Sequence, residues 1–152
     1  MAKIDQDKDI LTQAVQREVD ARNLFLALSR HVINPGIIKI LEELAQEEIE
    51  HKEILELELM KLGVTVDTET DKKPFKITDY VTSNTATFNM NYKDVLDLCI
   101  AKEDASFQFY ADILARTKDE NVKKVLKGLM EEELRHKIRF ENQRKNTLIQ
   151  PD

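Results

Sequence analysis

The sequence predicts an all-α fold, a four-helix bundle of two helical hairpins joined by a long crossover. Apolar residues recur at steps of three and four along four long segments, which is the period of one helix face. Gly and Pro are scarce, with three of each, and 34% of the 152 residues are charged. This length suits one hydrophobic core, so residues 1–152 are predicted to form a single domain.

The first hairpin is predicted from two apolar stripes separated by a helix break at residues 34–36. Pro35 suits the first turn of the second helix, and Gly63 suits the residue that follows its end. The predicted helices span about 8–31 and about 36–62. Their stripes consist of Leu11, Ala14, Ala21, Phe25, Leu28 and Val32, then Ile37, Leu41, Leu44, Leu55 and Leu62.

The crossover between the hairpins is predicted over residues 63–92, where the helical period is lost. Helices of about 25 residues span roughly 37 Å, and a connection of this length can run along the whole bundle. Five apolar residues of the crossover are expected to hold it against the bundle: Phe75, Ile77, Tyr80, Val81 and Phe88.

The second hairpin is predicted from the same period in the last third of the chain. Asn91 and Asp94 suit the start of its first helix, and Thr117 or Asp119 can cap its second. The predicted helices span about 93–117 and about 119–145, followed by a frayed tail. Their stripes consist of Leu96, Cys99, Ser106, Tyr110 and Ile113, then Val122, Leu126, Leu129 and Phe140.

Charge and cysteine content exclude several classes of function. The net charge of −6 argues against nucleic acid and anionic membranes as partners. The single cysteine, Cys99, can form neither an internal disulfide nor a four-cysteine iron centre, and we expect it to be a small core residue. The charged N-terminal segment is unlike a signal peptide, and no apolar run approaches the roughly 18 residues of a membrane span. We therefore expect a cytoplasmic protein.

Polar residues interrupt the four stripes at matched positions. The offset from Glu18 to Glu103 is 85 residues, and two further polar pairs and the flanking apolar residues share it. The hairpins therefore look like two copies of one helix pair, and a pseudo-twofold arrangement would bring the polar residues to one level of the core. The polar pairs are Glu18 with Glu103, Glu48 with Glu133, and His51 with His136.

These six residues are predicted to bind two metal ions. An unpaired ionised carboxylate in a core costs several kcal/mol, and two divalent cations balance four carboxylates. Residues three apart on a helix share a face, so each Glu-x-x-His pair can reach one metal. Carboxylates with imidazoles suit Fe(II) or Mn(II), and we expect two Fe ions per chain, with Mn or Zn as alternatives.

At these residues the chain resembles the ferritin-like superfamily, and within it the rubrerythrin-type di-iron proteins, over all four predicted helices. The resemblance implies a non-haem peroxidase or oxidase of oxidative-stress defence that reduces hydrogen peroxide or dioxygen through the bound metals. It also implies a role for each residue: Glu48 and Glu133 bridge the irons, Glu18 and Glu103 are terminal ligands, and His51 and His136 each bind one iron.

The chain departs from that family in three respects. It lacks the four-cysteine rubredoxin module, which implies an external electron donor such as a rubredoxin-like protein. Rubrerythrins carry an extra Glu one turn from the third-helix ligand, where this chain has Ile100 and Ser106, which weakens the expectation of a peroxide-driven iron shift. Classical ferritins of the same superfamily have a short fifth helix after the bundle, whereas only a few residues follow the last predicted helix here, which argues against a large storage shell. We expect a homodimer or a higher homo-oligomer.

Two other functions stay open, and several residues keep simpler interpretations. The chain could oxidise Fe(II) as a ferroxidase or storage protein, or it could be a structural metal-binding bundle. The Tyr110 hydroxyl could form a hydrogen bond with a liganding carboxylate, or Tyr110 could donate an electron to the site. Plain packing is an equal alternative, because its repeat partner Phe25 has no hydroxyl. His31 suits a helix C-terminus. A solvated helix face, with i,i+4 partners such as Lys52, accounts for Glu47, Glu50, Glu53, Glu56, Glu131, Glu132 and Glu141.

Overall fold

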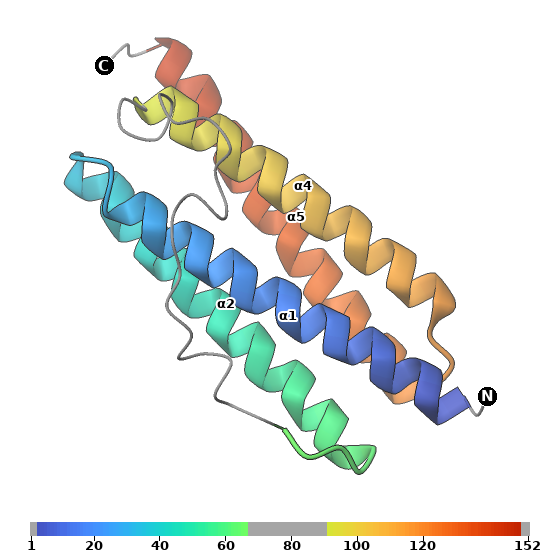
Figure 1. Ribbon diagram of the computed structural model, residues 1–152. Helices are drawn as coiled ribbons and strands as arrows, with labels where there is room; N and C mark the ends of the chain where they lie inside the picture. Colours follow the sequence, from blue (N-terminus) through green and yellow to red (C-terminus); the bar gives the residue numbers. More distant parts are fainter. Residues whose placement is uncertain (1–2, 67–90, 150–152) are drawn as a thin grey trace.

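Four long helices make up almost all of the residues that this computed structural model describes, 3–66 and 91–149 (Figure 1). They are α1 (Lys3–Ser29), α2 (Pro35–Lys61), α4 (Tyr92–Arg116) and α5 (Glu120–Ile149). The predicted all-α four-helix bundle is confirmed. The central part of the predicted crossover, with its five apolar residues, lies outside the described ranges.

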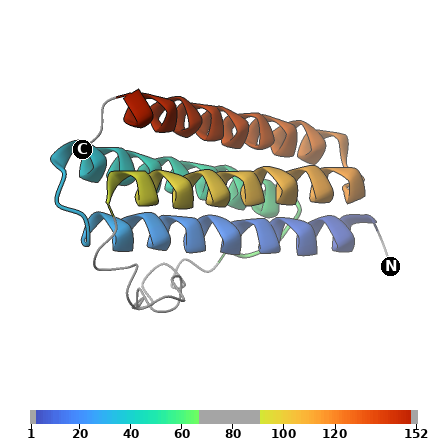
Figure 2. The same ribbon diagram turned by 90° about the horizontal axis from the view of Figure 1, so that it is seen from above.

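The helices are arranged as two hairpins that lie side by side (Figures 1 and 2). α1 packs against α2 and α4 against α5, and contacts of α1 with α4 and of α2 with α5 join the pairs. No helix in the described part of the chain combines the length and the apolar character that a membrane crossing requires.

The ends of α2 follow the predicted turn chemistry. The Asn34 side chain accepts hydrogen bonds from the backbone N–H groups of Gly36 and Ile37, at 2.8 and 3.3 Å, and Pro35 begins the helix. At the other end Gly63 has a φ of 87°, a left-handed conformation that disfavours side chains with a Cβ. The predictions for Pro35 and Gly63 are confirmed.

The second hairpin is capped by acidic and amide side chains. Asn91 accepts a hydrogen bond from the backbone of Asp94 at 2.9 Å, and the Asp94 carboxylate accepts one from the backbone of Asn91, as predicted. Asp119 caps α5 by accepting from the backbone N–H groups of Asn121 and Val122. Of the two predicted caps for this helix, Thr117 instead ends α4, and its hydroxyl donates to the Ile113 carbonyl at 2.7 Å.

Two helices are longer than predicted. α1 begins at Lys3 rather than near residue 8, and its first turns are tied to the far hairpin, because the two Asp7 carboxylate oxygens accept hydrogen bonds from the backbone N–H groups of Lys118 and Asp119. α5 continues to Ile149 rather than ending near residue 145, since no Gly or Pro interrupts the sequence before Pro151. The predicted frayed tail therefore begins too early.

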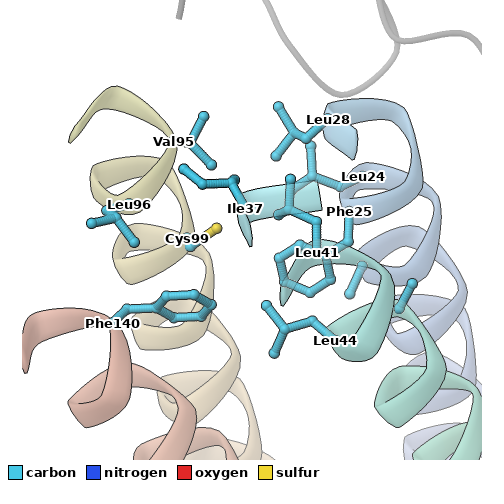
Figure 3. Close-up of a cluster of buried hydrophobic side chains, with 12 residues drawn as sticks. Leu24, Phe25, Leu28, Ile37, Leu41, Leu44, Val95, Leu96, Cys99 and Phe140 are labelled. Carbon is cyan, nitrogen blue, oxygen red and sulfur yellow. The ribbon is translucent and has the colours of Figure 1, made fainter. Parts of the chain in front are cut away.

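The core consists of two apolar clusters separated along the bundle axis. The first apolar cluster gathers one end of α1, α2 and α4 with Phe140 of α5 (Figure 3). The second apolar cluster gathers their other ends with Val122, Leu126 and Leu129 of α5. The predicted stripe residues are buried, except for Val32 and Leu62, which are partly buried. On every helix the polar interruption of the stripe falls between the two clusters.

Candidate metal centre

The six predicted ligands form one polar layer between the first and second apolar clusters. α1 contributes Glu18, α2 contributes Glu48 and His51, α4 contributes Glu103, and α5 contributes Glu133 and His136. All six are buried, and the most accessible of them, His136, is only 9% exposed. The layer exists because each helix runs unbroken through this level and turns its polar stripe positions inward.

The layer divides into two overlapping groups of possible ligands. One consists of Glu18, Glu48, His51 and Glu133, and the other of Glu48, Glu103, Glu133 and His136. Within each group the ligand atoms lie within 4.8 Å of one another. Glu48 and Glu133 belong to both groups, which is the arrangement that two carboxylates shared between two metal ions require.

Many atoms of the layer lack a hydrogen-bond partner among the described residues. Buried polar atoms rarely stay unpaired, because each costs about 1–3 kcal/mol in lost solvation. The unpaired set consists of Glu18 Oε2, Glu48 Oε1, both carboxylate oxygens of Glu133, Glu103 Oε2, and Nδ1 of His51 and of His136. This set of carboxylate oxygens and imidazole nitrogens fits a pair of divalent cations such as iron.

Crowding makes the shared carboxylates hard to ionise without a metal. Burial raises the pKa of Glu48 well above its ordinary value, and the neighbouring charge of Glu18 raises it further. Burial raises the pKa of Glu133 in the same way, with Glu103 as the next contributor. In the absence of metal, protons therefore neutralise charge that cations would otherwise balance.

The two histidines are protonated in the absence of metal because their carboxylate neighbours outweigh the effect of burial. Burial alone would lower the pKa of His51, but contacts with Glu133 and Glu18 outweigh it and raise the pKa to about 11. Burial also opposes protonation of His136, and its contacts with Glu103 and Glu47 raise the pKa to about 10. A metal that binds these rings must displace protons.

The two rings have matching geometry on the two sides of the layer. His51 Nδ1 lies 3.2 Å from Glu133 Oε1 and 3.6 Å from Glu18 Oε2, and His136 Nδ1 lies 3.4 Å from Glu103 Oε2. The ring planes are 8° from parallel, with centroids 6.1 Å apart. The repeat found in the sequence thus appears as a pseudo-twofold relation between the ligands.

Two glutamates that the sequence assigned to a solvated face contact the site. Glu132 contacts Nε2 of His51, and Glu47 Oε2 lies 2.5 Å from Nε2 of His136. Their side chains are 42% and 37% exposed. Both directly precede a predicted bridging residue and share the offset of 85, but Glu56 and Glu141 share that offset as well, so the repeat alone does not identify them. Glu56 forms the predicted i,i+4 ion pair with Lys52, at 3.1 Å, but it is buried and does not lie on a solvated face.

Tyr110 supports the site from α4. Its hydroxyl donates a hydrogen bond to Glu18 Oε1, and burial, followed by the Glu18 charge, raises the pKa of the phenol. Cys99 lies in the first apolar cluster as expected, and burial raises the pKa of its thiol.

Comparison with known protein families gives a match over most of the chain. Residues 9–143 match the rubrerythrin family model, and this range contains all six residues of the polar layer. Searches of curated proteins and of solved structures gave no significant match.

Proposed function

Because the chain belongs to the rubrerythrin family, we propose that it is a non-haem di-iron oxidoreductase that reduces hydrogen peroxide or dioxygen. The observation that carries the proposal is the sharing of Glu48 and Glu133 by two buried ligand groups. Two iron ions, when bound, supply the electrons for this reduction, while the chain supplies binding, orientation and electrostatics. Removal of peroxide by such a site is a defence against oxidative stress.

The polar layer offers each iron one complete set of ligands. Four carboxylates at −4 balance two divalent cations at +4, and the two imidazoles add no charge when they bind as neutral rings. One iron would be held by Glu18, Glu48, His51 and Glu133, and the other by Glu48, Glu103, Glu133 and His136.

The surrounding residues keep this layer preorganised. The first and second apolar clusters close it on both sides along the bundle axis and limit the access of water. In such a low-dielectric environment charge interactions are stronger than in water. Tyr110 keeps Glu18 Oε1 occupied, which leaves the unpaired Oε2 as the oxygen that could bind a metal.

The electrons that reset the site are proposed to come from an external donor such as a rubredoxin-like protein. Cys99 is the chain's one cysteine and is buried, so it offers no exposed thiol pair for electron entry. A free thiol also suits a reducing compartment, and we propose that the protein works in the cytoplasm as a homodimer or a higher homo-oligomer.

The decisive experiment is anaerobic loading with Fe(II), followed by stopped-flow mixing with hydrogen peroxide or with dioxygen, with iron counted per chain. We expect two bound iron ions per chain, and we expect hydrogen peroxide to oxidise them much faster than dioxygen does. Faster oxidation by dioxygen that continues beyond two irons per chain would favour a ferroxidase, and no oxidation would favour a structural metal site. Glu133→Ala, which removes a residue of both ligand groups, is expected to abolish the oxidation, and Glu131→Ala, which changes an exposed carboxylate beside the site, is its matched control.

A further inference from the structure

Two carboxylates outside the ligand groups approach the histidine rings from the other hairpin. Glu132 of α5 contacts Nε2 of His51 on α2, and Glu47 of α2 contacts Nε2 of His136 on α5. Neither residue belongs to a ligand group, and their side chains are partly exposed, although Oε2 of Glu47 is itself buried. Each hairpin therefore carries one histidine and the partner of the other hairpin's histidine.

The inner nitrogen of each ring faces the ligand carboxylates. Nδ1 of His51 and of His136 is buried without a hydrogen-bond partner among the described residues. A neutral imidazole has one N–H group and one lone pair, so the two nitrogens cannot serve as donors together. A carboxylate at Nε2 accepts the N–H there and leaves the lone pair on Nδ1, where a metal can bind it.

We propose that Glu47 and Glu132 are positioning residues that hold the histidines in the tautomer and ring orientation that present Nδ1 to the metals. Glu132 acts through His51 and Glu47 acts through His136. The near-parallel rings, 8° apart, are the orientation that this pair of contacts maintains. The inference rests on the metal centre of the proposed function but does not depend on which oxidant is reduced.

The crossed arrangement also links metal binding to the docking of the two hairpins. Each ring is fixed at its outer edge by a helix of the opposite hairpin, so separation of α2 from α5 would release both rings at once. The negative charge at Nε2 makes each imidazole a stronger ligand. Loss of either glutamate is therefore expected to weaken mainly the metal position of the histidine it contacts.

The test uses Zn(II), which is redox-silent, and NMR of the full chain labelled with ¹⁵N in histidine. In the wild-type protein with two zinc ions, both site rings are expected to show a metal-bound Nδ1 and a protonated Nε2. His31, the third histidine, serves as the internal reference. In Glu132→Ala the His51 ring is expected to lose this single pattern, and one zinc affinity is expected to fall about 10–100-fold. Glu47→Ala is expected to have the same effect through His136.

The control variants separate positioning from charge and folding. Glu131→Ala and Glu50→Ala remove exposed carboxylates next to the site on the same helices and should leave both rings unchanged. Glu132→Gln keeps an oxygen that can accept the Nε2–H and should restore the ring pattern if Glu132→Ala folds poorly. Wild-type ring shifts and zinc affinities in both alanine variants would overturn the inference, as would equal losses in the controls.

The outcomes also separate this inference from the proposed function. A wild-type chain that binds two zinc ions with Nδ1, but whose iron form does not react with peroxide or dioxygen, would overturn only the proposed function. Metal bound through Nε2 in the wild-type protein would overturn only the positioning roles of Glu47 and Glu132.

Discussion

The Tyr110 hydroxyl donates a hydrogen bond to Glu18, one of the four carboxylates of the polar layer. Phe25 occupies the matching position of the other hairpin, at the offset of 85, and has no hydroxyl to offer Glu103. The two sides of the layer therefore share a backbone arrangement but differ in the support of one terminal ligand. Glu18 Oε1 accepts from Tyr110, whereas Oε2 of both Glu18 and Glu103 lacks a hydrogen-bond partner among the described residues.

Tyr110→Phe is expected to destabilise the metal-free protein more than the metal-loaded protein. The substitution leaves Oε1 of Glu18 without its donor, which costs about 1–3 kcal/mol in the metal-free protein, whereas in the loaded protein a chelating Glu18 can bind the metal through Oε1 as well as Oε2. Denaturant unfolding of both forms measures the difference. Phe is already accommodated at position 25, so the variant should fold. Identical free energies of unfolding for the metal-free variant and the wild-type protein would contradict this role for Tyr110.

Glu133→Ala is expected to abolish binding of both metal ions, because Glu133 belongs to both ligand groups. Glu18→Ala removes a member of one group only and should affect one ion more than the other. Metal analysis after loading and desalting, together with calorimetric titration, measures both stoichiometries. If Glu133→Ala retained two ions per chain, Glu133 could not be a bridge.

The metal-free protein is expected to lose stability as the pH rises. The folded-state pKa of His51 is about 11 and that of His136 about 10, above the ordinary value of 6.5, and the pKa of Glu48 is raised above 4.5. The folded state therefore holds more protons than the unfolded state. The resulting stabilisation is complete below the ordinary pKa values and is lost as the pH rises through the folded ones.

Bound metal replaces those protons, so its contribution to stability should grow with pH. The difference in Tm between the loaded and metal-free proteins is expected to be at least about 4 °C larger at pH 8 than at pH 5.5, which corresponds to roughly 1–2 kcal/mol for a chain of this size. Differential scanning calorimetry at the two pH values measures it. If the difference in Tm between the loaded and metal-free proteins were the same at both pH values, loss of protons from the metal-free polar layer would not destabilise the protein.

Asp7→Ala is expected to lower the free energy of unfolding by about 1–3 kcal/mol, because two backbone N–H groups at the turn between α4 and α5 lose their acceptor. The Asp7 carboxylate is buried and accepts from Lys118 and Asp119 at 3.0 and 2.9 Å. Asp9→Ala, at an exposed position of the same helix, should change the free energy by less than about 0.5 kcal/mol. Equal effects of the two substitutions on the free energy of unfolding would contradict a stabilising role for the Asp7 contacts between the hairpins.

Much of the fold could be predicted because its signals are local. Pro35, Gly63 and the pair Asn91 and Asp94 act within one turn of their own helix end, and their conformations follow from their own chemistry. The early start of α1 could not be predicted in this way. Its tie through Asp7 is to residues more than a hundred positions away in the chain.

The sequence by itself determined which helix faces are buried and that six polar residues interrupt those faces, because the position of a side chain around a helix depends only on its place in the chain. Only the tertiary structure decided which atoms meet. Glu132 and Glu131 are neighbours of the same type, yet Glu132 contacts His51 and Glu131 is exposed. The rotation and axial offset of α5 against α2 set that difference, and they result from the packing of both apolar clusters together.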